Sequence, residues 1–492
     1  MSERASAVRL GTAAGRGTLA AAVLASGMVF LDTTVVNVAL PRLGADLGAS
    51  VAGLQWTVNG YLLTLAAFVL LGGALGDRFG RRRIFLIGVV WFTVASVLCG
   101  LALRTDWLVA ARFLQGAGGA LLTPGSLSLL QSTFHPDDRA KAIGAWSGLS
   151  GVSTALGPFI GGWLIDALSW RWIFFLNVPL AGLVLLATVR WVPESRDETV
   201  SRTREAGRGA RRFDVAGALL GALALAGVTY ALVDAPGRGL HSLPVVLAAV
   251  VAVLAAVVFV FVERRRGETA MLPTGLFGSR LFSVLNVFTV LVYAALSGFT
   301  FFFAVYLQNV VGWSAFRTGL ALLPMTVLLL VGSPGAGALS AKIGPRLLLT
   351  VGPVLAAAGL LMLRGVGPGA SYWSVLPGVA IFGAGLTMVV APLTASVLAA
   401  VADRFAGVAS GFNNAASRVG GLLAVAALPL LVGLSGTGYE QRAELTTAYR
   451  GALLWCAGLL LVGAATAALL VHRPARRSPQ KRSGAPVQQS DC

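Results

Sequence analysis

The fold of this chain is decided by a ten-residue stretch that occurs twice. Residues 73–82 read GALGDRFGRR and residues 337–346 read GALSAKIGPR, so that Gly, Leu, a basic residue, Gly and a final Arg recur at an offset of 264. The dipeptide Asp-Arg at residues 138–139 recurs at residues 403–404, an offset of 265. Two matches at nearly the same offset predict that the chain contains an internal duplication.

The segments around these stretches are strongly apolar. The 492 residues are 56% hydrophobic and 12% charged, with a mean hydropathy of +0.80, which excludes an ordinary soluble globular protein. A helix needs about 20 apolar residues to cross a bilayer. Runs of this length without alternating polarity favour helices over barrel strands. We therefore predict an all-α polytopic membrane protein with fourteen transmembrane helices, at residues 18–41, 54–76, 84–103, 107–133, 140–165, 173–192, 214–235, 243–263, 282–307, 317–340, 346–365, 374–400, 407–432 and 449–471.

The basic residues fix the predicted orientation. Cytoplasmic loops of membrane proteins collect Lys and Arg. With the N-terminus inside, inner segments hold twenty-eight of the 38 basic residues and outer loops hold eight, while Arg112 and Arg418 lie inside spans. We predict a multi-pass protein of the cell inner (cytoplasmic) membrane with both termini cytoplasmic. This distribution accounts for the net charge of +18 without a nucleic-acid partner.

The duplication divides the predicted chain into two six-span halves, an arrangement found in transporters. The expected domains are a cytoplasmic N-tail (1–17), an N-terminal six-helix bundle (18–193), a cytoplasmic linker (194–213), two inserted transmembrane helices (214–263), a second cytoplasmic linker (264–281), a C-terminal six-helix bundle (282–472) and a cytoplasmic C-tail (473–492).

Five motifs in chain order resemble the major facilitator superfamily, specifically its fourteen-span drug:proton antiporter branch. They are residues 31–41 (LDTTVVNVALP), 73–82, 112–119 (RFLQGAGG), 157–162 (GPFIGG) and 170–179 (WRWIFFLNVP). The resemblance implies the major facilitator fold, with two six-helix bundles plus two extra central helices. It also implies export of drugs or antibiotics in exchange for protons.

Asp32 is the acidic residue that lies deepest within a predicted span. A charged Asp near the bilayer centre costs roughly 2.5–3.5 kcal/mol on insertion scales, so its side chain should face the bundle interior. Arg112 and Gln115 share one face of the span 107–133, and a buried Arg needs an acidic partner. Asp32 is the acid best placed in depth, so we predict that it pairs with Arg112.

Two interpretations of this pair stay open. In the first, the pair couples transport to protons: Asp32 binds a proton at one stage, and Arg112 approaches it in one conformation and withdraws in the other. In the second, the pair is static and structural, or a neutral Asp32 holds its span in place through a hydrogen bond.

The resemblance implies roles for two further motifs. Gly157, Pro158, Gly161 and Gly162 belong to a motif that the family associates with antiport, and they form either a gate against leak or a tight packing surface. Asp77, with Arg78 and Arg82, would form a conformational latch by docking on the N-terminal end of the span 407–432, near residues 403–407, in the outward-facing state. The alternative is that these Arg residues only set topology.

Three polar residues are candidates for lining a central cavity, namely Gln115, Asn414 and Arg418. Arg418 could equally serve packing alone. The three Cys and three His are scattered, so we expect neither a metal site nor a cofactor.

The sequence thus predicts a proton-coupled efflux transporter for small amphiphilic compounds that works by alternating access. The expected partners are the substrate, protons and the lipid bilayer, and we expect the chain to function as a monomer. A uniporter or importer of a small metabolite with the same fold is the main alternative. An intramembrane enzyme is less favoured because no catalytic constellation is visible.

Overall fold

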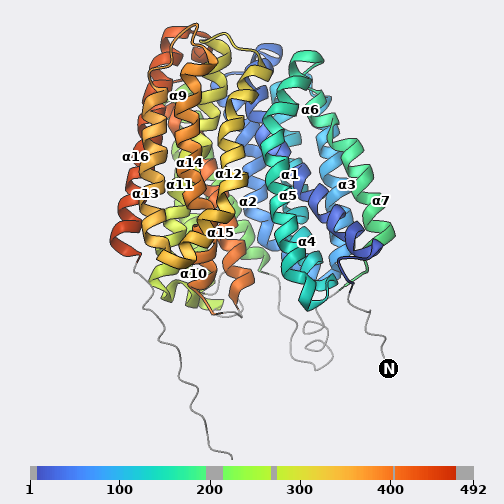
Figure 1. Cartoon of the computed structure of the whole chain (residues 1–492). Helices are drawn as coiled ribbons and strands as arrows, with labels where there is room; N and C mark the ends of the chain where they lie inside the picture. Colours follow the sequence, from blue (N-terminus) through green and yellow to red (C-terminus); the bar gives the residue numbers. More distant parts are fainter. Residues whose placement is uncertain (1–7, 196–213, 267–273, 403–404, 472–492) are drawn as a thin grey trace, which may run out of the picture.

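The computed structural model describes residues 8–195, 214–266, 274–402 and 405–471, and this part of the chain is all-helical apart from turns and one isolated bridge (Figure 1). The helices are α1 (Ala13–Leu47), α2 (Val51–Phe79), α3 (Arg81–Gly100), α4 (Thr105–Thr133), α5 (Pro136–Ala167), α6 (Trp172–Phe175), α7 (Asn177–Trp191), α9 (Val215–Arg238), α10 (Leu243–Arg266), α11 (Arg280–Asn309), α12 (Ala315–Ile343), α13 (Pro345–Leu363), α14 (Tyr372–Ala399), α15 (Ala406–Leu431) and α16 (Arg442–Leu470), with short 3₁₀ turns η2 (Thr274–Gly278) and η4 (Gly438–Glu440).

The predicted all-α membrane class is confirmed. Within the described ranges, thirteen helical segments are long and apolar enough to cross a membrane, with α6 and α7 counted together as Trp172–Trp191. The remaining predicted span, 107–133, is present as α4, a helix of 29 residues. It is less apolar than the others because it carries Arg112 and Gln115 besides several Gly, Ser and Thr residues, and it packs against α2 and α3.

The contacts between helices repeat in the two halves of the chain. In the first half, α1 packs on α5 and α7, while α4 packs on α2 and α3; in the second half, α11 packs on α15 and α16, while α14 packs on α12 and α13. Contacts between the halves are also symmetric, because α5 meets α12 and α2 meets α15. Figure 1 shows the halves side by side, and their matching contacts support the duplication inferred from the sequence.

The two extra helices pack outside this symmetric pattern. Helices α9 and α10 pack on each other, and α9 also contacts α2 and α15, one helix from each half. Trp56 of α2 faces Tyr230 of α9, with ring centroids 6.4 Å apart. Helices α9 and α10 therefore lie beside the boundary between the two halves, with α9 in contact with both.

One predicted span, 173–192, is interrupted in the structure. Helix α6 ends at Phe175 and α7 begins at Asn177. Pro179 has no N–H for the carbonyl of Phe175, so the regular helical ladder stops there. The hydroxyl of Ser96 in α3 donates to the carbonyl of Phe174 at 2.8 Å, and the amide of Asn177 donates to that hydroxyl at 2.9 Å. These two hydrogen bonds tie the interrupted segment to α3.

The two ends of the molecule differ. We call the side where residues 8 and 471 lie the tail side, and the opposite side the far side. On the far side, α1 ends at Gly48, whose φ of 58° is left-handed and favours glycine. Side chains of Ser50 and Ser314 cap the far-side starts of α2 and α12.

Candidate functional site

The core of the candidate site is a buried ion pair between α1 and α4. Nη1 of Arg112 lies 2.6 Å from Oδ2 of Asp32. The amide of Gln115 donates to Oδ1 of Asp32 at 2.8 Å, and its carbonyl oxygen accepts from Nη1 of Arg112 at 2.8 Å. The spacing of three residues between Arg112 and Gln115 brings both side chains to the face of α4 that meets α1.

Helix α2 completes the enclosure of Arg112. Nε of Arg112 donates to the backbone carbonyl of Thr57 at 3.0 Å, and the guanidinium carbon lies 4.2 Å from the centre of the Tyr61 ring. A guanidinium over an aromatic face gains a cation–π attraction that strengthens when water is excluded. Nothing in the sequence pattern identified Thr57 or Tyr61, because their role depends on how α2 docks against α4.

The site is closed to solvent in this conformation. Asp32 is 2% exposed, Arg112 is 1% exposed and Gln115 is fully buried. The expectation that Gln115 lines a cavity is therefore wrong for this state, because its amide is used to bind Asp32 and Arg112. Removing one partner would leave a buried charge unpaired.

The other two cavity candidates, Asn414 and Arg418, lie on α15 and are partly buried. The guanidinium of Arg418 lies 5.9 Å from the ring of Phe30 on α1, so it sits between the halves. It forms no ion pair with any described residue. The neighbouring Asn413, which sequence reasoning missed, donates instead to Asn286 and Thr289 of α11, at 3.1 and 2.7 Å, within its own half.

The glycine motif of α5 makes close contacts with two helices, α1 and α12. A Cβ on Gly157 would lie 2.2 Å from Oγ1 of Thr34 in α1, and one on Gly161 would lie 2.4 Å from Val35. On the side facing the other half, a Cβ on Gly162 would lie 2.6 Å from the Ala315 carbonyl of α12. The Pro158 carbonyl in turn lies 2.1 Å from where a Cβ on Gly319 would be. The motif therefore sits where α5 touches both α1 and α12.

The proposed latch residues lie at the tail side. Asp77 pairs with Arg81 across the turn between α2 and α3, at 2.7 Å. The guanidinium of Arg78 lies 5.4 Å from the Phe79 ring. Of the expected docking place for Asp77, residues 403 and 404 lie outside the described residues.

Glu194 is a further contact of this loop that the sequence did not indicate. Its carboxylate accepts hydrogen bonds from the backbone N–H groups of Arg82 and Arg83, at 3.1 and 3.2 Å, at the uncapped start of α3. The guanidinium of Arg82 donates to the carbonyl of Val189 at 2.9 Å. Arg82 therefore ties the loop to the end of α7.

Hydrogen bonds join the halves at the far side. The amide of Gln55 in α2 donates to the Val425 carbonyl of α15 at 2.7 Å, and the amide of Gln308 in α11 donates to the Val38 carbonyl of α1 at 2.8 Å. The hydroxyl of Tyr439 donates to the Ala49 carbonyl at 2.7 Å. Burial raises the pKa of Tyr439 to about 12, so this donor stays protonated at physiological pH.

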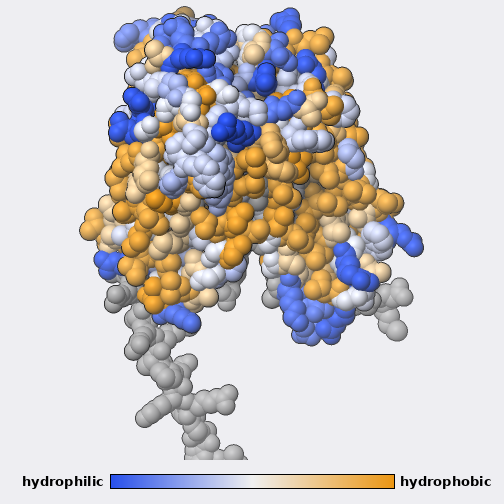
Figure 2. Space-filling view, turned by 45° about the horizontal axis from the view of Figure 1, so that its top comes forward, coloured by the Kyte–Doolittle hydropathy of each residue, from blue (hydrophilic) through white to orange (hydrophobic). Residues whose placement is uncertain are grey.

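The tail side is open in comparison. Figure 2 shows a notch between two lobes at the tail-side edge of the molecule. The hydrogen bonds that join the halves thus lie at the end of the molecule opposite this notch.

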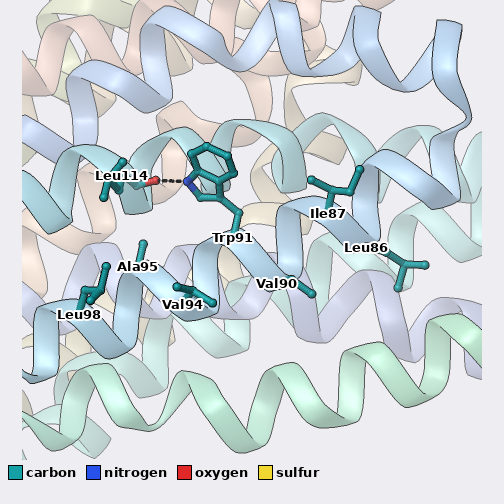
Figure 3. Close-up of a pocket in the computed structure, with 8 residues that line it drawn as sticks. All are labelled: Leu86, Ile87, Val90, Trp91, Val94, Ala95, Leu98 and Leu114. Atoms are coloured by element: carbon teal, nitrogen blue, oxygen red, sulfur yellow. Dashed lines mark hydrogen bonds between the residues drawn. The ribbon is translucent and has the colours of Figure 1, made fainter.

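A separate apolar groove of about 530 Å³ lies on the outer face of α3. Its lining, shown in Figure 3, is Leu86, Ile87, Val90, Trp91, Val94, Ala95, Leu98 and Leu114. The indole N–H of Trp91 donates to the Leu114 carbonyl at 2.9 Å. This hydrogen bond satisfies the N–H group at a place where lipid tails offer no acceptor. The groove holds no charged group and belongs to the membrane-facing surface.

Comparison with known proteins places this architecture in a family. The model of the Major Facilitator Superfamily matches residues 22–425. The tetracenomycin C resistance and export protein of Streptomyces glaucescens is 39% identical over 84% of this chain and 75% of its own length. The methylenomycin A resistance protein of Streptomyces coelicolor is 35% identical over 92% of both chains.

Solved structures agree with the fold. An inward-facing, unoccupied bacterial homologue of the human lysosomal transporter Spinster superimposes with a TM-score of 0.63 at 19% identity, covering 94% of this chain and 97% of that one. A POT family transporter bound to a thioalcohol-conjugated peptide gives a TM-score of 0.66 at 14% identity, over 92% and 94%. The sequence relatives are resistance and export proteins rather than enzymes. The chain belongs to the Major Facilitator Superfamily of membrane transporters, as its five motifs predicted.

Proposed function

We propose that this protein exports small amphiphilic compounds, drugs or antibiotics, across the cytoplasmic membrane in exchange for protons. The observation that carries the proposal is the buried Asp32–Arg112 pair, an ionisable group enclosed inside a two-half transporter fold. The names of the relatives supply the substrate class, because they include antibiotic resistance and export proteins. A uniporter of the same fold would not require a proton-binding acid inside the first helix.

In the proposed cycle, the structure corresponds to a state open to the cytoplasm. Arg112 holds Asp32 in its ionised form while substrate enters from the tail side. Rearrangement of α1 against α4 separates the pair as the far side opens, and Asp32 takes a proton as the substrate leaves. In this scheme the substrate binds when the tail side is open, and the proton binds when the far side is open. Binding of each one therefore shifts the equilibrium between the two conformations, which couples their movements in opposite directions. Gly157, Pro158, Gly161 and Gly162 would seal the far side, and Asp77, with Arg78 and Arg82, would latch the tail side.

The proposed orientation puts the tail side in the cytoplasm and the far side outside. The division into two six-helix bundles (18–193 and 282–472), two inserted helices (214–263) and cytoplasmic tails and linkers is proposed with it. Function as a monomer is part of the same proposal, because each half supplies one wall of the space between them.

This orientation can be tested by labelling single cysteines with a membrane-impermeant reagent. A cysteine within residues 435–445, between α15 and α16, should react in intact cells. A cysteine within residues 196–212, between α7 and α9, should react only after the membrane is broken. The reverse pattern would overturn the orientation.

Export itself is tested with cells that express the protein and a panel of fluorescent drugs and dyes. Expressing cells should accumulate less of a substrate than cells expressing the Asp32→Asn variant, and an uncoupler should abolish the difference. Accumulation above that of the control cells would favour the importer alternative.

Charge limits the proposed substrates. Asp32 is the acid in the ion pair at the core, and Arg418 adds a cation between the halves that forms no ion pair with another described residue. One proton driven by about 150 mV releases roughly 3.5 kcal/mol, enough for a several-hundredfold gradient of a neutral compound. A dication would leave a charge uncompensated beside Arg418. We therefore expect export of neutral and monocationic amphiphiles and exclusion of rigid dications.

A matched pair of monovalent and divalent cationic dyes checks this limit. Efflux of the monovalent dye should exceed efflux of the divalent dye by at least about tenfold, since an uncompensated charge in a membrane interior costs roughly 2.5 kcal/mol or more. Comparable efflux of both dyes would mean that a second acidic residue reaches the substrate.

A further inference from the structure

The carboxylate of Asp166 bridges the two halves at the far side. Asp166 is the last residue but one of α5, and its two oxygens accept hydrogen bonds from the backbone N–H groups of Ala315 and Phe316, at 3.2 and 2.8 Å. Those groups open α12 in the other half. Asp166 lies one turn beyond Gly162, which is itself one turn beyond Pro158, so these three residues form one stripe of α5 facing α12.

The position of Asp166 is unfavourable within its own helix. A negative charge in the last turn of α5 opposes the helix dipole, which places partial negative charge at that end. The start of α12 reverses this effect, because its free N–H groups carry partial positive charge. Ser314 caps only the N–H of Arg317, so Asp166 satisfies donors that α12 cannot satisfy alone. The stabilisation of this carboxylate thus depends on contact between the halves.

We propose that Asp166 is a positioning residue that holds the far side closed while the tail side is open. The proposal rests on the alternating-access cycle described above. When the far side opens, α5 and α12 must separate, and Asp166 loses both charge-assisted hydrogen bonds. In the proposed cycle Asp77 favours closure of the tail side through the start of another helix, α15. The two carboxylates would then bias the equilibrium in opposite directions.

Distance measurements between spin labels on the two halves test this role. Leu103 and Trp373 are far-side residues of the first and second half, and they are 77% and 75% exposed. Both are replaced by Cys for labelling, with Cys492 changed to Ser; Cys99 and Cys456 are fully buried. The protein is studied in lipid nanodiscs as the native chain and as the Asp166→Asn and Asp166→Ala variants.

The matched control is Asp46→Asn. Asp46 is also an exposed far-side acid near a helix end, but its carboxylate accepts from the indole of Trp170 at 2.8 Å within its own half. Opening of the far side lengthens the distance between the two spin labels. We expect the ratio of molecules with a long distance to molecules with a short distance to rise at least about fivefold in both Asp166 variants, since the stabilisation of a charge at a helix terminus is of this size. The control should match the native chain. Unchanged distances in the Asp166 variants would overturn the proposal.

The same samples separate this proposal from the proposed function. Proton-driven substrate uptake into inverted vesicles reports export, whereas the distances report only the far-side contact. A shift in the Asp166 variants together with no proton-driven uptake by the native chain would support the role of Asp166 and contradict proton-coupled export. Active native protein with no shift would contradict the role of Asp166 alone.

Discussion

Replacing Asp32 by Asn is expected to abolish uphill, proton-driven export, because the amide cannot bind and release a proton. Downhill exchange of substrate should persist, since it needs only the conformational change. The pH dependence of substrate binding should disappear as well. Proton-driven uptake into inverted vesicles measures the first effect, and exchange of labelled for unlabelled substrate without a proton gradient measures the second.

A complication of this variant follows from the geometry. Arg112 is 1% exposed, and without Asp32 its charge would be buried with no acidic partner, at a cost of about 3–5 kcal/mol. We therefore expect the single variant to accumulate poorly in the membrane. The double variant Asp32→Asn with Arg112→Gln removes both charges, so its membrane level should recover while uphill export stays absent. Undiminished uphill export by either variant would show that the proton binds elsewhere.

The second large effect is expected from Gly162→Ala. A Cβ at this position would lie 2.6 Å from the Ala315 carbonyl and 2.7 Å from the Phe316 Cα, and these are backbone atoms that cannot move aside as a side chain can. The far-side contact between α5 and α12 should therefore loosen. Overpacking of this kind typically costs about 1–3 kcal/mol, which would shift the ratio of far-side-open to far-side-closed molecules by roughly fivefold to a hundredfold.

Gly148→Ala provides a matched control on the same helix. Nothing lies within 4 Å of a Cβ built at Gly148. Both substitutions remove a glycine from the interior of α5, so they share the gain of about 0.5–1 kcal/mol in helix propensity. Export should fall strongly with Gly162→Ala and stay near the native level with Gly148→Ala. Equal export by the two variants would show that the glycine motif has no role in closing the far side.

The class of the molecule could be predicted from the amino-acid sequence alone. Apolar runs of this length without alternating polarity satisfy their backbone as helices, so fourteen spans could be located, with errors at their ends and a missed interruption within 173–192. The pairing of Asp32 with Arg112 was also accessible, because a charge in a span needs a partner and few partners exist at that depth. The duplicated stretches at 73–82 and 337–346 anticipated the two-fold contact pattern of the halves.

The backbone groups that meet across the two halves could be identified only from the three-dimensional structure. The partners of Gln55 and Gln308 are carbonyls, and every residue has one, so no residue type marks them in advance. Asp166 finds the start of α12 for the same reason, through backbone N–H groups that the sequence does not distinguish. Gln115 was expected to line a cavity but is buried. The position of a residue in a helix indicates on which face its side chain lies, but not whether a neighbouring helix covers that face. Contacts of this kind depend on how whole helices dock, which local sequence patterns do not encode.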